Sequence, residues 1–411
     1  MRDNKILDVT PDVKWIGVLD KDIVAFDIVM ETKYGTTYNS YFIDAGKKAI
    51  IETTKATFWD IWIEKVKGVT DPADIDYIIL NHTEPDHSGN LQNLLKLAPG
   101  AIVVGSGNAI RYLEDIVSVP FKSLKVKDGD TLDLGTKTLK FISAPNLHWP
   151  DSIYTWLEED KVLFTCDSFG AHFCTEEMFD DLVGNYDDSF KYYFDVILKP
   201  YSKFMIKAIE KIRPLDISVI ATGHGPILRK NWKKYVDLSE KFSREYLDDT
   251  RITGNHVLVT YVSAYGYTKR MAEIIASGIS ESDVNVTVEL ADIETMPLGE
   301  LESLIVRCNG LLVGSPTFNQ NTLLPVYKMF ALINPIRDKG KLAASFGSYG
   351  WSGEAVKIIE DNLRNLKLEI SDAGYGGKFY SHAEKTEELK NFGKNFARQM
   401  PDLKSPVSMS S

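Results

Sequence analysis

Short apolar runs separated by polar turns fill the first half of the chain. Runs of roughly four to eight residues with such boundaries predict strands and hairpins. The predicted strands cover 48–53, 77–80, 101–106, 123–145 and 152–167, and apolar residues at helical spacing predict helices over 91–98, 194–212 and 231–249. The first 250 residues are therefore expected to form one domain that mixes strands, hairpins and a few helices.

The pattern changes near Arg251 to Asn255, after which strands and helices alternate. Predicted strands cover 256–263, 284–290, 310–315 and 341–347, and predicted helices cover 268–279, 323–333, 354–366 and 385–400. Strands that alternate with helices indicate parallel βαβ units and a doubly wound sheet. Residues 255–405 are thus expected to form a second domain with about five strands.

Composition narrows the classes of partner. The chain has 411 residues, which suits two domains, and a net charge of -11, which argues against nucleic acid or an anionic membrane as partner. Its three cysteines form no CxxC pair, so a disulfide framework and a four-cysteine iron centre are unsupported. No run is long and apolar enough to span a bilayer and no signal core is present, so we expect a cytoplasmic protein.

One short loop gathers groups that bind metals. The stretch "HTEPDH" contains His82, Glu84, Asp86 and His87, and these charges would repel or stay solvated unless a cation compensated them. Three further candidates each follow an apolar strand: His148, Asp167 and His224. Strand ends on one sheet edge bring such groups together. The alternative for each residue taken singly is an ordinary surface or capping role.

Seven candidate ligands divide between two metals. His82, Glu84 and His148 are expected on one metal, Asp86, His87 and His224 on the other, with Asp167 between them. Three carboxylates leave two divalent cations with a small net positive charge. Imidazole suits zinc, copper and iron alike, whereas carboxylates are harder donors, so Glu84 moderately favours iron over zinc.

Three loops in the second domain predict a flavin site, because each follows a strand and so lies at the ligand crevice of an open α/β sheet. The first is a phosphate loop before a helix N-terminus. Neither a nucleoside triphosphate loop nor a complete GxGxxG is present. The candidate FMN contacts are Ser263, Ala264, Tyr265, Gly266, Tyr267 and Thr268 in the first loop, Ser315, Pro316, Thr317, Phe318 and Asn319 in the second, and Ser348, Tyr349, Gly350, Trp351, Ser352 and Gly353 in the third. Tyr349 and Trp351 are placed to flank a planar ring or to pack ordinarily.

Taken in order, these motifs resemble the flavodiiron proteins, also called A-type flavoproteins. The HxExDH loop, "LHWPDS", "CD", "GHG", "GSPT" and "YGW" carry the resemblance, which covers nearly the whole chain. It implies a metallo-β-lactamase-like αββα sandwich over 1–250 and a flavodoxin-like domain over 255–405. The seven residues above are then the ligands of two non-haem irons, with a water in place of His87 in some members.

The resemblance also implies a function. Members of this family reduce dioxygen to water, nitric oxide to nitrous oxide, or both. The electron donor would be external, such as rubredoxin, and the flavin of one subunit would face the partner's irons in a head-to-tail homodimer or a dimer of such dimers. Trp351 resembles the residue at that junction, and His172 and Tyr193 resemble pocket residues that donate hydrogen bonds or protons.

Two other functions fit part of the pattern. A dizinc hydrolase with a flavodoxin-like appendage would use the same fold, although Glu84 argues against it. A non-enzymatic electron carrier with a structural metal site would use the same flavin loops. The preference between dioxygen and nitric oxide and the identity of the donor stay open, with a reduced deazaflavin or NADH through another protein as further donors.

Overall fold

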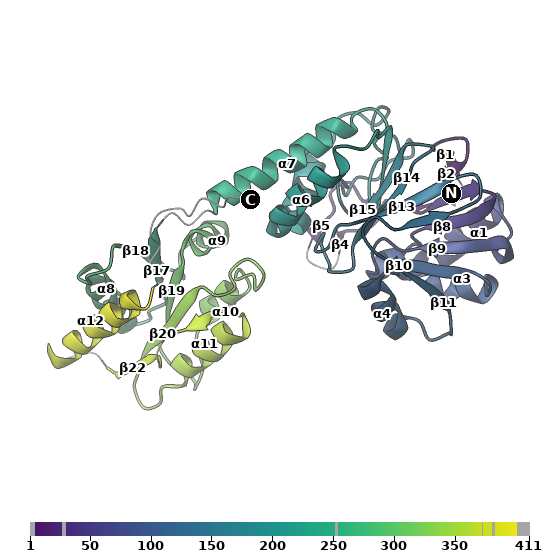
Figure 1. Cartoon of the computed structure of the whole chain (residues 1–411). Coiled ribbons are helices and arrows are strands. Elements are labelled where there is room, and N and C mark those ends of the chain that lie inside the picture. The colour runs from purple at the N-terminus through teal and green to yellow at the C-terminus, as the bar shows by residue number, and fades with distance from the viewer. Residues whose placement is uncertain (1–4, 27–29, 251–253, 372, 380–382, 401–411) are drawn as a thin grey trace. The chain divides into compact units, whose positions relative to one another are not determined.

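The chain folds into two compact units, Met1–Leu247 and Asp248–Ser411 (Figure 1). A computed structural model describes residues 5–26, 30–250, 254–371, 373–379 and 383–400. The predicted boundary at Arg251 to Asn255 lies partly outside the described residues, because the description omits 251–253.

Two sheets form the centre of the first unit. Their strand orders, among the described residues, are β1-β2-β7-β8-β9-β10-β11 and β12-β13-β14-β15-β16. The strands are β1 (Leu7–Asp8), β2 (Val13–Trp15), β7 (Tyr41–Ala45), β8 (Lys47–Ile51), β9 (Ile75–Ile79), β10 (Ile102–Ser106), β11 (Lys122–Val126), β12 (Thr131–Asp133), β13 (Thr138–Ser143), β14 (Ile153–Leu157), β15 (Val162–Cys166) and β16 (Val219–Thr222). Two short ribbons, β3 (Val18–Asp20) with β6 (Thr36–Tyr38) and β4 (Ala25–Phe26) with β5 (Met30–Glu31), flank them.

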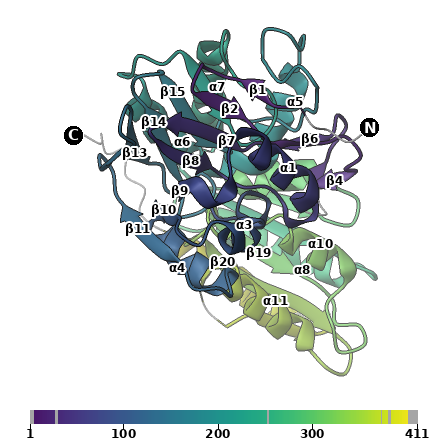
Figure 2. The same cartoon turned by 90° about the vertical axis from the view of Figure 1, so that its right-hand side faces the viewer.

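Helices cover the outer face of each sheet, which makes the predicted αββα sandwich (Figure 2). The first sheet carries α1 (Trp59–Val69), α3 (Leu91–Leu97) and α4 (Gly107–Ile116), and the second carries α5 (Asp187–Tyr193), α6 (Ser202–Ile212) and α7 (Trp232–Asp249). Adjacent strand residues explain the apolar runs: Ile51 faces the second sheet, whereas Ile50 packs among the helices. Strands buried on both faces are apolar throughout, which is the pattern seen in the sequence.

The predicted helix over 194–212 is interrupted. A π-helical turn, η3 (Phe194–Leu198), and a 3-10 turn, η4 (Lys199–Tyr201), precede α6. Pro200 lacks the N–H that a continuous helix needs at that position, and the local winding changes there. The result matters for function, because Tyr193 and Ile197 next to this break line the cavity described below.

The second unit is a parallel doubly wound sheet of order β18-β17-β19-β20-β21, in which β22 also pairs with β20. Its strands are β17 (Asn255–Tyr261), β18 (Val286–Asp292), β19 (Gly310–Gly314), β20 (Leu342–Tyr349), β21 (Glu369–Ile370) and β22 (Tyr375–Lys378). Two short strands thus share the fifth position: β21 pairs with the start of β20 and β22 with its end. The prediction of about five strands missed this division, since neither short strand has an apolar run.

Helices lie on both faces of this sheet (Figure 1). One face carries α8 (Tyr267–Ser280) and α12 (Ala383–Arg398), and the other carries α9 (Leu298–Arg307), α10 (Leu324–Phe330) and α11 (Glu354–Asn365). The α8 and α12 backbones approach closely at two glycines. A Cβ at Gly278 would overlap the Lys390 carbonyl oxygen, and a Cβ at Gly393 would overlap that of Ile275.

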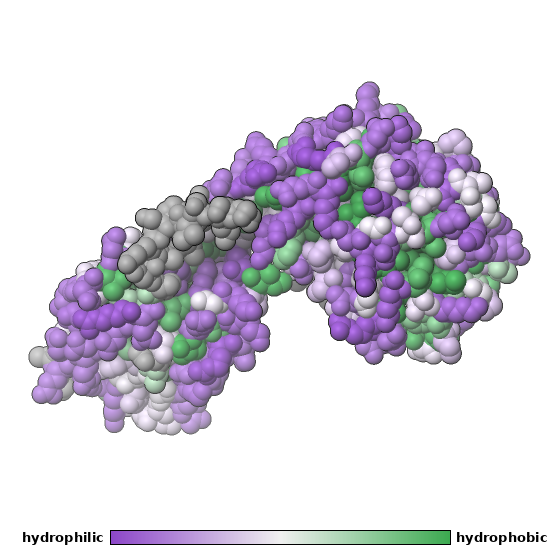
Figure 3. Space-filling view, in the orientation of Figure 1, coloured by the Kyte–Doolittle hydropathy of each residue, from purple (hydrophilic) through white to green (hydrophobic). Residues whose placement is uncertain are grey.

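The face of the molecule in Figure 3 is mainly hydrophilic, with scattered hydrophobic residues. Exposed large apolar side chains include Leu182, Leu324, Ile336 and Trp351. Among the residues that the model describes, no helix combines the length and apolarity needed to cross a membrane.

We predict that Gly278→Ala loosens the second unit. The added methyl forces α8 away from α12, and overpacking of this kind costs about 1–3 kcal/mol. Gly299→Ala in α9 is the matched control, because open space surrounds its Cβ position, and a change within about 1 kcal/mol is expected there. Native-state hydrogen exchange of α8 amides measures both; equal protection in the two variants would contradict the close contact.

Candidate metal and cofactor sites

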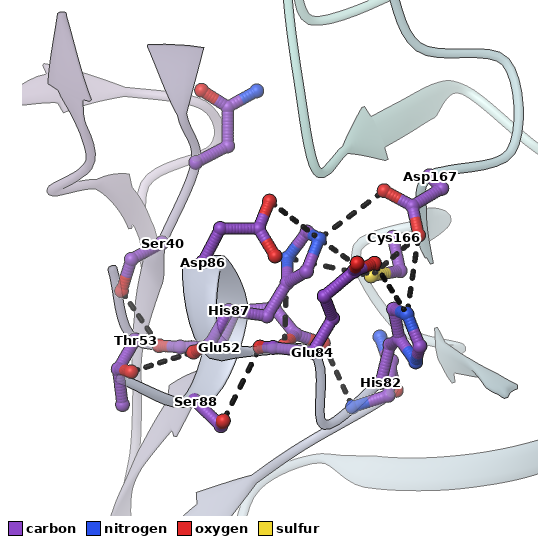
Figure 4. Close-up of polar contacts among 12 residues, drawn as sticks. Ser40, Glu52, Thr53, His82, Glu84, Asp86, His87, Ser88, Cys166 and Asp167 are labelled. Atoms are coloured by element: carbon purple, nitrogen blue, oxygen red, sulfur yellow. Dashed lines mark hydrogen bonds and ion pairs between the residues drawn. The ribbon is translucent and has the colours of Figure 1, made fainter. Parts of the chain in front are cut away.

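Seven carboxylate and imidazole side chains meet at one edge of the two sheets of the first unit. His82 and Glu84 follow β9, Asp86 and His87 lie in the short helix α2 (Pro85–Ser88), and His148, Asp167 and His224 follow β13, β15 and β16. Figure 4 shows His82, Glu84, Asp86, His87 and Asp167 pointing toward one another. The structure therefore brings together every residue that the sequence nominated as a metal ligand.

One half of the cluster consists of His82, Glu84 and His148. The Oε2 atom of Glu84 lies 3.2 Å from His82 Nε2 and 3.0 Å from His148 Nε2. Together with Asp167, these side chains each offer a ligand atom within 4.8 Å of the others. A mixed shell of two imidazoles and two carboxylates is typical of a site for a first-row transition metal.

The other half consists of Asp86, His87 and His224. The Oδ2 atom of Asp86 lies 3.1 Å from His224 Nε2 and 3.4 Å from His87 Nε2. All three side chains are buried, so their charges are compensated within the protein rather than by solvent.

Asp167 lies between the two halves and presents one oxygen to each. Its Oδ2 is 3.7 Å from His82 Nε2 and 3.8 Å from His148 Nε2. Its Oδ1 is 3.1 Å from His87 Nε2 and 3.4 Å from His224 Nε2. This arrangement allows one carboxylate to bridge two metal ions.

Neighbouring groups fix the orientation of two of the imidazoles. Both oxygens of Asp151 lie 3.2 Å from His82 Nδ1, and Thr83 donates to Asp151 from its N–H and its hydroxyl, each at 2.8 Å. The Nδ1 of His224 donates to the Thr37 carbonyl oxygen at 2.6 Å. With Nδ1 engaged, Nε2 of each ring faces the cluster and is the nitrogen left to bind a metal. Asp151 is not among the residues predicted for the site, although it stands only three residues after His148.

The electrostatics of the cluster are those of buried opposite charges. Burial raises the pKa of Asp86, but His87 and His224 outweigh it and hold that pKa at about 2. Burial lowers the pKa of His224, but Asp167 and Asp86 outweigh it and raise that pKa to about 10. Burial also lowers the pKa of His82, but Asp151 and Glu84 outweigh it and raise that pKa well above its usual value. Without metal, protons on the imidazoles therefore balance the carboxylates.

The residues present fit a pair of metal cations. Both carboxylate oxygens of Asp86 are buried without a hydrogen-bond partner among the described residues, and Oδ2 has only the ion-pair contact with His224 Nε2 at 3.1 Å. Unpaired buried carboxylate oxygens are rare unless an ion engages them. Nitrogen and oxygen donors predominate in the cluster, and its carboxylates are the hard donors that suit iron.

A small cavity of about 20 Å³ opens on the cluster. Its lining combines polar residues of both halves with the apolar side chains of Phe26, Met30 and Ile197. A volume of this size holds about one small molecule. Of the two residues nominated as proton donors, Tyr193 lines the cavity and donates to Asp167 Oδ1 at 3.2 Å.

His172 lies behind this lining rather than in it. Its Nδ1 is 3.0 Å from the Thr36 hydroxyl, and its ring packs 4.8 Å from that of Tyr193. Burial, aided by His224, lowers the pKa of His172 to about 3, so the ring is neutral. His172 is therefore not placed to contact a molecule in the cavity directly.

The three predicted flavin loops meet at the carboxyl edge of the second sheet. The Thr268 and Ser348 hydroxyls lie 2.9 Å apart, and the Thr317 N–H donates to the Ser348 carbonyl oxygen at 2.9 Å. The rings of Tyr265 and Phe318 stack with centroids 6.1 Å apart. Residues from all three loops thus surround one surface region, as predicted from strand order.

This region fits a flavin phosphate and ring. The Ser263 hydroxyl oxygen is buried without a partner among the described residues, and no side chain caps the N-terminus of α8. Gly266 adopts a left-handed conformation, with φ of 81°, which turns the chain into α8. An unpaired hydroxyl beside an uncapped helix N-terminus suits a phosphate. Trp351 is 78% exposed and stands at the third loop.

Comparison with protein families assigns both units. Residues 36–225 match the family described as ODP family beta lactamase, and residues 259–393 match the family described as Flavodoxin. These matches agree with the αββα sandwich and the doubly wound sheet, so the predicted fold class is confirmed.

Relatives and solved structures resemble the chain over almost its whole length. The Flavo-diiron protein FprA2 of Clostridium acetobutylicum is 39% identical and covers 94% of this chain and 97% of its own. The type A flavoprotein fprA of Rhodobacter capsulatus is 38% identical and covers 97% and 92%.

Among solved structures, the rubredoxin oxygen:oxidoreductase of Desulfovibrio gigas aligns with a TM-score of 0.63 at 26% identity, over 96% of this chain and 98% of its own. The flavodiiron protein of Giardia intestinalis aligns with a TM-score of 0.61 at 29% identity, over 96% of each chain. The chain therefore belongs to the flavodiiron proteins, which are oxidoreductases whose cofactors are FMN and a non-haem diiron centre.

Proposed function

We propose that this protein reduces dioxygen to water, nitric oxide to nitrous oxide, or both. The observation that carries the proposal is the carboxylate-rich cluster, in which Asp167 offers one oxygen to each half and Glu84 stands where a hydrolytic zinc site more often has histidine. When bound, the irons supply the sites for the diatomic substrate and the flavin supplies the electrons. The seven clustered side chains are the proposed iron ligands.

The residues around the cavity have roles that follow from their chemistry. Phe26, Met30 and Ile197 exclude water and favour a small uncharged molecule. Burial raises the pKa of Tyr193 well above its usual value, with Asp167 adding to the effect. Its hydroxyl therefore keeps its proton and can donate a hydrogen bond or a proton in the cavity. We assign His172 a supporting role through its contact with Tyr193.

The electron donor and the assembly belong to the same proposal. Among the described residues, no cysteine cluster for an iron–sulfur centre occurs, and the three cysteines of the chain, Cys166, Cys174 and Cys308, form no CxxC pair. We propose an external donor, such as rubredoxin, and a head-to-tail homodimer, as in the resemblance stated above. The exposed Trp351 and Tyr265 support a contact surface beside the flavin loops. We also propose a cytoplasmic location, and the net charge of -11 argues against nucleic acid or an anionic membrane as a partner.

We predict about two irons and one FMN in each natively purified chain, as the ligand set implies. Glu84→Ala removes one ligand and is expected to lower turnover of both gases roughly 100-fold or more, since even outer-shell changes cost up to that factor. FMN content should not change. Glu114→Ala, at an exposed position of α4, is the control. Gas consumption by the reduced protein is measured with an electrode.

Other results would favour the rival functions. Two zincs per chain together with ester or lactam hydrolysis that ignores flavin reduction would identify a hydrolase. Full gas turnover in Glu84→Ala would contradict the proposed reaction at this site.

We predict that metal binding weakens as pH falls. In the metal-free protein the pKa of His224 is about 10, so the imidazole carries a proton that the metal must displace. Asp86, with a pKa of about 2, stays ionised and adds no pH dependence. Between about pH 6 and 8, the binding constant should rise about tenfold per pH unit for each displaced proton. Competition with a chelator of known protonation constants measures this slope, and a slope of zero would contradict it.

We predict that Ser263→Ala and Thr268→Val each weaken FMN binding. A hydrogen bond to a charged group contributes about 1.5–3 kcal/mol, which corresponds to about 10- to 100-fold in Kd. Titration of the flavin-free protein, followed by FMN fluorescence, measures the Kd. Ser303→Ala, on the exposed surface of α9, is the control. An unchanged Kd in both loop variants would place the phosphate elsewhere.

A further inference from the structure

His87 occupies an enclosed position in which only one ring nitrogen faces the metal cluster. Its Nε2 lies 3.1 Å from Asp167 Oδ1 and 3.4 Å from Asp86 Oδ2. Its Nδ1 points the opposite way, toward Glu52 (Figure 4). Whether His87 binds iron depends on what keeps the ring in this orientation, because a rotated ring would leave the place to water.

Glu52 is the only carboxylate among the described residues within ion-pair distance of His87 Nδ1. It follows β8, is 2% exposed and has a φ of 58°, which few residues other than glycine adopt. Its Oε1 accepts the Asn81 N–H at 2.7 Å, whereas its Oε2 lies 3.9 Å from His87 Nδ1 and has no hydrogen-bond partner among the described residues. Buried, unpaired oxygens and unusual backbone conformations are both concentrated at functional sites.

The residue after Glu52 holds the backbone of His87. The Thr53 N–H donates to the His87 carbonyl oxygen at 2.8 Å, and the Thr53 hydroxyl donates to the same oxygen at 2.5 Å. Glu52 and Thr53 thus contact His87 at its ring and at its main chain. The turn after β8 therefore determines both where this residue lies and which way its ring can point.

Gly223 and Cys166 close the remaining sides of the ring. A Cβ at Gly223 would lie 2.9 Å from His87 Cε1 and 2.9 Å from the Cys166 carbonyl carbon, so no larger residue fits without displacing the ring. The Cys166 sulfur is 3.5 Å from Nδ1 and 3.7 Å from Nε2. Its similar distance from both nitrogens places it beside the ring rather than in line with either lone pair.

We propose that Glu52 and Gly223 are positioning residues that hold His87 as a ligand of the second metal. Glu52 faces the Nδ1–H with its Oε2 at an ion-pair distance of 3.9 Å, and this charge favours the tautomer that leaves the Nε2 lone pair for the metal. Gly223 provides the space in which the ring sits. This inference rests on the proposed diiron function, and it adds a reason why His87, rather than a water, completes that half of the site in this chain.

Glu52→Gln and Gly223→Ala test the two parts separately. Gln keeps the volume and an acceptor for Asn81, but its NH₂ then faces the Nδ1–H and favours the wrong tautomer. Ala pushes the ring sterically and leaves Glu52 intact. Each variant should hold one iron of the pair about 10- to 100-fold less tightly. Each should also reproduce the change that His87→Ala causes in the Mössbauer spectrum of ⁵⁷Fe-loaded protein, while the signal of the iron at His82, Glu84 and His148 stays unchanged.

Two controls separate positioning from general damage. Asp180→Asn alters another buried carboxylate of the same unit, which accepts backbone N–H groups of Arg229, Lys230 and Asn231. Gly107→Ala adds a methyl where open space surrounds the Cβ position. Both should keep the wild-type spectrum and iron content.

Wild-type spectra in Glu52→Gln and Gly223→Ala would overturn this inference and leave the proposed function standing. A wild-type spectrum in His87→Ala would do the same. A third metal ion bound by Glu52, His87 and Cys166 would also overturn it. Wild-type protein that binds no iron pair would instead refute the proposed function, and the inference with it.

Discussion

The placement of one buried carboxylate, Asp167, determines much of the site in the first unit. It is 1% exposed and lies between two pairs of imidazoles. A charge at such a depth costs several kcal/mol unless other charges compensate it closely. The two halves of the site therefore need each other, because Asp167 is satisfied only when groups on both sides are in place. Strands β9, β13, β15 and β16 end at the same edge and supply those groups.

The rest of the sandwich gives this cluster its rigidity. Asp151 and the Thr37 carbonyl fix two rings from behind, while Glu52 and Gly223 confine a third. These four groups, Asp151, Thr37, Glu52 and Gly223, come from four separate segments of the chain. A site built from many chain segments keeps its geometry only if the layers on both sides are closely packed. The packing between the apolar faces of the two sheets therefore supports the site, since it keeps the strand ends that carry the ligands aligned.

The sequence revealed the elements whose pattern is local. Strand runs such as 48–53 and 310–315 and the ligand types in "HTEPDH" can be recognised without a structure. The partners of those ligands cannot, because they are set by tertiary contact: Glu52 is 35 residues from His87, and Gly223 stands 136 residues beyond it. The broken helix after Tyr193 was also missed, since Pro200 interrupts a helical pattern whose apolar spacing continues on both sides. Short strands such as β21 and β22 have too few residues for any periodicity.

The two proposed cofactor sites differ in exposure in a way that suits their chemistry. The metal cluster opens on a cavity of about 20 Å³ whose lining is partly apolar, so only a small molecule fits there. The flavin loops carry exposed aromatic residues, with Tyr265 at 79% and Trp351 at 78%. Electrons can cross closely packed protein without an open channel, whereas water and ions need such a channel. Under the proposed function, a closed site for the gas and an open edge for the flavin would let the protein accept electrons from a large partner while it excludes bulk solvent from the metals. The proposed binding of His87 to the second metal agrees with this arrangement, because a protein ligand at that place leaves one less coordination position for water.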